Sequence, residues 1–593
     1  MKRWTYYIVV VVLLLTGCTD QPQKFENQVA FAKTYGYVKY FHPSDEATKI
    51  DWNKFSIYGA TQINKCKTKA EVIHVLQTLF EPIAPTIKFA TDSSDFDLQT
   101  KNVLPDKIEN FKTTHWQHLG VNVGMNYKGD GYKSWRVNRD SSENSNQLFK
   151  FEPNPQESLI KKIGCGIYCQ IPIALYCNNK GTFPKANQSK LENLIKQIEN
   201  VNDTSATDLY LRLGNVINTY NVFQHFYPYF KEVTVDWDSE FKKALKQSYS
   251  DKTALNHLFT LEKFTAPLKD GHVMVSNFSL DNYYAPPISW EWIENKLIIT
   301  KIEASNDSIK VGDIVNHING KSSKEYFKDI HLRISAATKG WLQYRSQRVS
   351  KLGSKESLIR IKIRDKEYKL KRTVNPYVWQ KKFENKTNYK EIEKGLWYLN
   401  LDVIDMETIQ TLLPKLEESK SIICDMRGYP TIGNLNFIRH LLENNNTTLD
   451  CARIPQTVYP DHDKLIGYGY QNWNDYVKVK KPYLGNKNLI FITDGSAISY
   501  AETIMGYIEG YKLATIIGQP TAGTNGAINR FCLPGGFNVS LTGMKVVKHD
   551  GSQHHGIGIL PNIYVEKTIR GIIDGRDEYL EKAIEIIKNK NAL

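Results

Sequence analysis

Apolar residues recur at helical spacing in two separated stretches of the chain, residues 25–92 and 205–275. Each stretch holds an apolar segment that ends at a proline, then a turn and a segment led by tryptophan. A second amphipathic segment follows, and in the first stretch it covers residues 70–80. Side chains three or four positions apart share one face of a helix. The pattern therefore predicts two helical units.

The two helical units are related copies. A shift of 185 positions places identical residues of the first unit on the second without a gap, and chance does not explain such identity. The matching pairs are Thr34 with Thr219, Tyr35 with Tyr220, Phe41 with Phe226, Pro43 with Pro228, Asp51 with Asp236, Trp52 with Trp237, Lys67 with Lys252 and Thr68 with Thr253.

The segments after the first helical unit have a different pattern. Residues 95–200 carry aromatic and β-branched runs such as 164–177, broken by Gly, Asn and Asp, which predicts a β-rich insertion. Residues 285–373 alternate short β-like runs with the segment 309–320, IKVGDIVNHING. This segment resembles the PDZ pattern of a Gly-Asp turn, an apolar strand and an Asn-Gly turn. PDZ domains bind peptide C-termini at a sheet edge, but any small β-barrel with an Asn-Gly hairpin is an alternative.

From residue 374 to the end, at 593, strand-like and helix-like segments alternate. The expected strands are 395–403, 420–425 and 488–493, and the expected helices are 406–418, 435–443 and 500–510. Such alternation predicts a layered α/β domain. Ligands of these sheets bind at the carboxyl ends of the strands, so chemistry is expected there.

Length and charge narrow the class of protein. The 593 residues should form about four domains of roughly 150 residues each. The 41% hydrophobic and 24% charged residues exclude wholesale disorder and a multi-span membrane protein. The net charge of +14 is spread through mixed Lys/Glu stretches without basic blocks interleaved with aromatics, so nucleic acid is not an expected partner.

Residues 1–18 have a short basic start and an apolar run too brief to span a bilayer comfortably, which predicts an export signal. The last four, LTGC, resemble the bacterial lipobox, in which the cysteine is diacylated. That resemblance implies a lipid anchor on Cys18 and a place in the cell envelope, on the inner or outer membrane, facing the periplasm or the cell surface. An uncleaved anchor helix is the alternative.

Seven cysteines follow Cys18 without a CxxC pair, so no metal site is predicted. Cys165, Cys169 and Cys177 lie close enough in sequence for one disulfide, which an exported compartment permits. A buried free thiol is the alternative.

Residues 489–503, LIFITDGSAISYAET, predict an apolar strand, a turn of small residues and a helix. Ser499 stands at the start of that helix, where backbone N–H groups and the helix dipole favour negative charge. This place suits a nucleophile. The spacing of Ser499 and Glu502 is also that of a capping box, in which the serine has only a structural role at the start of the helix.

Three further segments form a constellation with Ser499. They are 425–430 (DMRGYP), 518–526 (GQPTAGTNG) and 556–562 (GIGILPN). In this order they resemble the C-terminal-processing, or tail-specific, peptidases of family S41. The resemblance covers about residues 205–570 and implies a layered, ClpP/crotonase-like core, a serine nucleophile at Ser499 and an oxyanion hole at Gly428 and Tyr500, with no cofactor.

The chain departs from this family at two catalytic positions. Thr524 stands where the Ser-Lys members have their general base. The chain resembles instead the tricorn-core-like branch, in which a histidine upstream of the PDZ region is the base, and residues 270–272 (Asp-Gly-His) match that motif. His272 is therefore the expected base, although a lone histidine is more often a structural core residue.

The branch also has a glutamate that orients this histidine, and its place is taken here by His555. His555 or Gln553 could accept the imidazole N–H, but without a carboxylate's charge. A surface turn that binds nothing is the alternative for this His pair.

The domains expected from the sequence are an export signal (1–18), a helical unit (25–92), a β-rich insertion (95–200), a second helical unit with His272 (205–275), a PDZ-like domain (285–373) and a peptidase core (374–593). The implied function is a serine endopeptidase that acts on polypeptides through an acyl-enzyme. A catalytically inactive peptide-binding scaffold is the rival.

Overall fold

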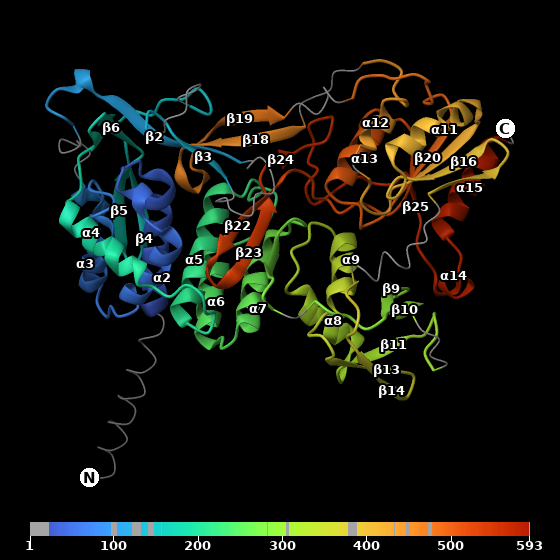
Figure 1. Ribbon diagram of the computed structural model, residues 1–593, viewed down its shortest axis with the longest axis horizontal. Helices are drawn as coiled ribbons and strands as arrows, with labels where there is room; N and C mark the ends of the chain where they lie inside the picture. Colours follow the sequence, from blue (N-terminus) through green and yellow to red (C-terminus); the bar gives the residue numbers. More distant parts are fainter. Residues whose placement is uncertain are drawn as a thin grey trace, which may run out of the picture.

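The computed structural model describes most of the chain after the predicted export signal (Figure 1). Cys18 lies outside the described residues. Among the described residues, no helix combines the length and apolar composition needed to span a bilayer. The described ranges are 23–96, 104–120, 132–139, 147–155, 157–280, 283–303, 308–376, 388–431, 433–445, 451–471 and 477–591.

Helices form where the two repeated units were expected, and the repeated residues mark their starts. Asp51 and Asp236 accept a hydrogen bond from the third residue after them and cap α2 and α6, while Thr68 and Thr253 do the same for α3 and α7. The first backbone N–H groups of a helix have no carbonyl partner within the helix, and capping side chains supply an acceptor for them. The helices are residues 23–41, α2 (Trp52–Ile63) and α3 (Lys69–Phe80), and α5 (Leu209–Phe226), α6 (Trp237–Ser250) and α7 (Ala254–Thr265).

The β-rich insertion shares a sheet with a distant part of the chain. The strand order is β19-β18-β2-β6-β7, and Gln456 of β18 lies opposite Leu119 of β2. Figure 1 shows β18 and β19 between the helical units and the C-terminal domain. A pairing across more than 300 positions leaves no trace in local periodicity, and the sequence analysis missed it. The bounds are β2 (Lys112–Leu119), β6 (Ala174–Asn178), β7 (Gly181–Phe183), β18 (Ala452–Thr457) and β19 (Leu465–Gln471).

The three cysteines considered for a disulfide are free thiols. Cys169 and Cys177 are buried and Cys165 is half-buried. Burial raises the pKa of the Cys165 thiol to about 11, which keeps the group protonated and unreactive near neutral pH.

Residues 288–371 form two small sheets and two helices. Asn319 and Gly320 have positive φ angles of 48° and 84° and connect β11 to β12, as expected for an Asn-Gly hairpin. The elements are β9 (Ile288–Ile293), β10 (Lys296–Ile302), β11 (Val315–Ile318), β12 (Lys321–Ser322), α8 (Ser323–His331), α9 (Lys339–Val349), β13 (Leu358–Ile363) and β14 (Lys366–Lys371).

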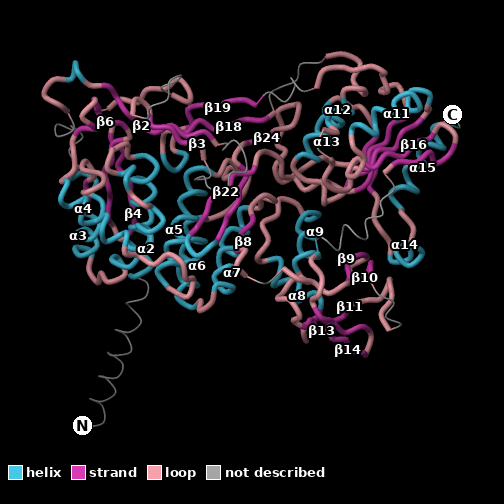
Figure 2. Tube along the Cα trace, viewed as in Figure 1, coloured by secondary structure: helices cyan, strands magenta, loops and turns pink. Residues whose placement is uncertain are grey.

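The C-terminal domain is built on a sheet of order β15-β16-β17-β20-β21-β25, parallel from β16 onward. Alternate strand residues pack on α11, α12 and α13 on one face and on α15 on the other (Figure 2). The mixed, multidomain α/β class is confirmed. The bounds are β15 (Tyr389–Glu393), β16 (Leu396–Asn400), α11 (Met406–Glu418), β17 (Ser421–Asp425), α12 (Leu435–Ile438), β20 (Asn488–Thr493), α13 (Tyr500–Gly510), β21 (Thr515–Gly518), β25 (Ile563–Tyr564), α14 (Ile569–Asp574) and α15 (Glu578–Asn591).

A small antiparallel sheet joins the second helical unit to the C-terminal domain. Its order is β22-β23-β8, with Met274 of β8 opposite Ser540 of β23. β8 begins two residues after His272. The C-terminal domain thus reaches back to the segment that carries the expected base. The bounds are β8 (Met274–Asn277), β22 (Ile528–Leu533) and β23 (Phe537–Thr542).

Helix α9 contacts the turn before Ser499 through two glycines. A Cβ atom added to Gly495 would lie 2.5 Å from the Cα atom of Gly340, and one added to Gly340 would lie 2.9 Å from the Cα atom of Gly495. Backbone atoms meet here with no room for a side chain, so the 288–371 region and the turn constrain each other.

We expect Gly340→Ala to lower the free energy of unfolding by about 1–3 kcal/mol, because the new methyl group forces backbone atoms apart. Gly506→Ala in α13 is the matched control. Nothing lies within 4 Å of its added Cβ, so the change should raise stability by up to about 1 kcal/mol. Urea unfolding measures both, and equal effects would show that the glycine contact imposes no constraint.

Candidate active site

Ser499 has an unusual backbone conformation at the junction of β20 and α13. Its φ is 59° and its ψ is −114°, and its side chain makes no capping hydrogen bond to the helix. A positive φ is uncommon outside glycine and costs free energy, and such residues gather at functional sites. The side chain is half-buried. The hydroxyl is therefore not used to begin the helix.

Glu502 does not complete a capping box either, so that interpretation was wrong. Its carboxylate is buried and accepts hydrogen bonds from the Thr521 hydroxyl and from the N–H groups of Gly523 (2.7 Å) and Thr524 (2.8 Å). Nε2 of His554 lies 3.3 Å away. Burial alone would raise the pKa of Glu502, but His554 and these donors hold it below its usual value. Glu502 thus fixes the 521–524 turn against α13.

His272 is buried, and its two ring nitrogens differ in their surroundings. Nδ1 lies 3.0 Å from the Thr542 hydroxyl, whereas Nε2 is buried without a hydrogen-bond partner among the described residues. Burial lowers the pKa of His272, with Asp270 and Glu502 acting in the opposite direction. The imidazole is therefore neutral at pH 7.

Thr524 connects the two expected catalytic segments. Its carbonyl accepts the Ser499 N–H at 3.0 Å, and its hydroxyl accepts the Gly271 N–H at 2.9 Å. A Cβ atom on Gly271 would lie 2.8 Å from the side chain of Ile498. The Asp-Gly-His segment and the serine turn are thus in contact. The structure describes no hydrogen bond between the Ser499 hydroxyl and His272.

The expected oxyanion residues follow neighbouring strands. β17 and β20 are parallel neighbours, so the turn with Gly428 and the start of α13 lie at the same sheet edge. The Tyr429 hydroxyl is next to the Ser499 side chain and the Tyr500 N–H. Burial raises the pKa of Tyr429, and these two hydrogen bonds oppose the rise. A Cβ on Gly428 would lie 2.4 Å from a carboxylate oxygen of Asp402, so a larger residue here would require the Asp402 side chain to shift.

Among the described residues, neither expected orienting residue forms a hydrogen bond with the His272 ring. Gln553 is exposed and donates to the carbonyl of His555 at 2.7 Å. The His555 ring stacks on Tyr229 with centroids 3.9 Å apart. His554 and His555 are both buried, so the interpretation of this pair as a surface turn was wrong.

The nearby lysines are paired away from Ser499. Lys545 forms an ion pair with Glu232, and Lys548 forms one with Glu509 at 2.8 Å. Among the described residues, no group of three His, Cys, Asp or Glu side chains is arranged to hold a metal ion.

A groove of about 1620 Å³ runs between the second helical unit, the 288–371 region and the C-terminal domain. Gly271, next to His272, and Ser496, three residues before Ser499, line it, whereas Ser499 and His272 themselves do not. Exposed apolar side chains also lie along it, namely Met274, Phe278, Ile557, Leu560 and Tyr564. The groove is large enough for an extended peptide and reaches the residues next to the expected catalytic pair.

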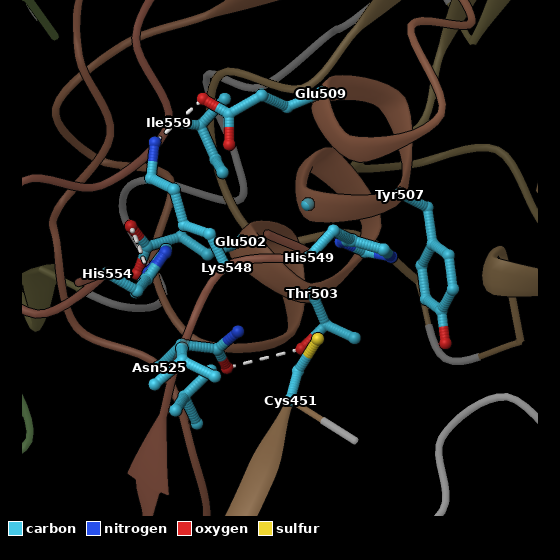
Figure 3. Close-up of a pocket in the computed structure, with 13 residues that line it drawn as sticks. Cys451, Glu502, Thr503, Tyr507, Glu509, Asn525, Lys548, His549, His554 and Ile559 are labelled. Atoms are coloured by element: carbon cyan, nitrogen blue, oxygen red, sulfur yellow. Dashed lines mark hydrogen bonds and ion pairs between the residues drawn. The ribbon is translucent and has the colours of Figure 1, made fainter. Parts of the chain in front are cut away.

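A second, small cavity is lined in part by Glu502 (Figure 3). Its volume of about 30 Å³ has room for about one water molecule. Figure 3 shows Glu502 paired with His554 and Thr503 bonded to Asn525 on its wall. This cavity is too small for a substrate.

Comparisons with known proteins agree with the motifs. Residues 405–565 match the model described as peptidase family S41. A structure of mature CPAF complexed with lactacystin is 13% identical with a TM-score of 0.52, and the match covers 64% of this chain and 97% of that chain. A structure of mature CPAF gives 13% identity, a TM-score of 0.51 and coverage of 64% and 96%. No curated protein sequence matches. Residues 405–565 are therefore similar to peptidase family S41, and the fold of the chain is similar to that of CPAF.

Because Ser499 does not cap α13 and the Glu502 carboxylate is fully hydrogen-bonded, substitutions of these two residues should affect stability very differently. We expect Ser499→Ala to change the free energy of unfolding by less than about 0.5 kcal/mol, because no cap is lost. Glu502→Ala should cost about 3 kcal/mol, because it leaves buried donors unpaired. Thermal and urea unfolding of both variants measure this. If Ser499→Ala lowered the free energy of unfolding by about 1 kcal/mol and Ser499→Asn restored it, Ser499 would be a helix cap after all.

Proposed function

We propose that the protein is a serine endopeptidase that hydrolyses polypeptides through an acyl-enzyme. Ser499 attacks the carbonyl carbon of the scissile bond while Nε2 of His272 takes its proton. The imidazolium then protonates the leaving amine, and water hydrolyses the ester by the same route in reverse. The N–H groups of Tyr500 and Gly428 stabilise the oxyanion, once the substrate carbonyl displaces the Tyr429 hydroxyl. No cofactor takes part.

One observation carries this proposal. A serine with a positive φ makes no capping hydrogen bond to its helix, a buried histidine has no hydrogen-bond partner at Nε2 among the described residues, and both segments bind Thr524. Catalytic hydrogen bonds are often long in substrate-free enzymes and tighten on binding, so a direct bond is not required at rest. Thr524 occupies the lysine position of the other branch, which supports assignment to the Ser-His branch.

The groove of about 1620 Å³ is the proposed site of the polypeptide substrate. β8 is an edge strand of its sheet, and Met274 and Val275 line the groove. An extended chain adds readily to such an edge. We propose in addition that the PDZ-like region, 285–373, binds the substrate's C-terminus, which the Asn319-Gly320 hairpin supports.

A catalytically inactive peptide-binding scaffold is the second candidate. The contact of the Tyr429 hydroxyl with Ser499 and the Tyr500 N–H favours it, because a filled oxyanion hole cannot stabilise a transition state. The two candidates share the groove and differ only in whether Ser499 reacts.

Peptide-library digestion by residues 19–593 distinguishes them. We expect Ser499→Ala and His272→Ala to lower kcat/KM by at least about 1000-fold, whereas Lys545→Ala and Lys548→Ala remain close to wild type as matched controls. The acid limb of the wild-type pH profile should lie below pH 6.5, because burial lowers the pKa of His272 and the neutral form is the base.

Two results would contradict this account. Hydrolysis that persists in Ser499→Ala would show that Ser499 is not the nucleophile. A dependence on Lys545 or Lys548 in place of His272 would mean that the branch is wrong.

We also propose that the protein is exported and lipid-anchored through Cys18, on the inner or outer membrane, facing the periplasm or the cell surface. The sequence LTGC after the apolar run supports this, and a diacylated cysteine anchors a protein without a membrane-spanning segment.

Cys18→Ala should leave the folded body unchanged but prevent lipidation and normal signal cleavage, because the thiol is the acylation site. Membrane fractionation and intact-protein mass measure this, with Cys532→Ala, an exposed cysteine in the body, as the control. Unchanged fractionation and cleavage in Cys18→Ala would exclude the anchor.

A further inference from the structure

The surroundings of His272 contain a carboxylate that the family resemblance did not assign. Asp270 is buried, and its Oδ1 accepts hydrogen bonds from the His272 N–H at 2.9 Å and from the Thr542 hydroxyl at 2.8 Å. Its Oδ2 accepts the Thr542 N–H at 3.1 Å. Asp270 therefore holds Thr542 by two bonds, directly beside the His272 ring.

The direction of these bonds determines the tautomer of His272. A threonine hydroxyl has one proton, and here it donates to Asp270. The 3.0 Å contact between the hydroxyl oxygen and Nδ1 of His272 must then be donated by Nδ1–H. With the proton on Nδ1, Nε2 carries the lone pair, and Nε2 is the buried atom without a partner. The base atom is thus left ready to accept a proton.

We infer that Thr542 and Asp270 are positioning residues for His272 and supply what the missing glutamate supplies elsewhere in the branch. Thr542 accepts the Nδ1–H bond, which fixes the tautomer and the orientation of the ring. Asp270 is connected to the ring through the Thr542 hydroxyl. When Nε2 takes the Ser499 proton, the imidazolium keeps Nδ1–H donated to Thr542, and Thr542 keeps its own proton donated to Asp270. No proton passes to the carboxylate, which stabilises the cation by its charge.

Further contacts keep this arrangement rigid. The Ser540 hydroxyl donates to the carbonyl of His272 at 2.6 Å, and the Asp270 N–H donates to the Ser335 hydroxyl at 2.8 Å. Asp270 and His272 belong to the Asp-Gly-His motif, whereas Thr542 ends β23. His555, which takes the place of the glutamate, stacks on Tyr229. The group that orients His272 therefore comes from β23 and not from the segment that carries His555.

The inference rests on the proposed role of His272, and Thr542→Val tests it without a change of shape. We expect kcat to fall roughly 100-fold, because the hydroxyl that selects the tautomer is lost, and Thr542→Ser to recover most of the rate. Thr114→Val is the matched control, since Thr114 is equally buried and its hydroxyl has no partner among the described residues. Its kcat should equal that of wild type.

Nitrogen NMR of ¹⁵N-histidine-labelled protein gives a readout that does not depend on turnover, with the His272 signals identified by their loss in His272→Ala. Wild type and Thr542→Ser should show Nδ1 protonated and Nε2 unprotonated, and Thr542→Val should lose this preference. Wild-type kcat and an unchanged tautomer in Thr542→Val would overturn the inference while leaving the proposed function intact. Hydrolysis by Ser499→Ala would overturn the function instead, and the NMR result would still decide whether Thr542 sets the tautomer.

Discussion

Pairing between β23 and β8 is the constraint on which the candidate active site depends. The register that places Met274 opposite Ser540 also places His272, two residues earlier, beside Thr542 at the end of β23. β22 follows the 521–524 turn, whose N–H groups bind Glu502. One short antiparallel ladder thus joins a histidine from the second helical unit to a serine more than 200 positions away. The contacts of Thr524 with Gly271 and Ser499 add to this connection.

Glu502 supplies the second constraint. A buried carboxylate is costly unless each oxygen is paired, and here the Thr521 hydroxyl, two backbone N–H groups and His554 offset that cost. These bonds hold the turn that carries Thr524, and Thr524 binds both Ser499 and Gly271. Glu502 therefore acts on the site through Thr524 and not through Ser499, although its spacing from Ser499 is that of a capping box.

Much of the fold could be predicted from the sequence, because local periodicity determines single elements. The expected bounds of α11, β20 and α13 are those of the structure, and the repeat identities include the side chains that cap α2 and α6. α12 was predicted to reach residue 443 but ends at Ile438. The pairing of β2 with β18 and of β8 with β23 could not be predicted, since each joins strands more than 200 positions apart and adds no local signal.

For the candidate site too, local motifs could be predicted from the sequence, whereas contacts between distant strands could not. Motif order indicated Ser499, His272, Gly428 and Tyr500, and the structure brings their segments together. The Asp270–Thr542 pair was missed because Thr542 belongs to no motif. Its only sequence signal is an alternating strand that ends at a threonine, which is too common to interpret. A hydrogen-bonding residue becomes recognisable only when the register of β23 is known.

The central claim is that Ser499 is an activated nucleophile. A fluorophosphonate probe, followed by peptide mass spectrometry of the adduct, tests it most directly in folded residues 19–593. The account predicts one adduct, on Ser499, which forms far more slowly in His272→Ala and is absent after unfolding. No adduct on Ser499 in the folded protein, or labelling at the same rate in His272→Ala, would contradict it.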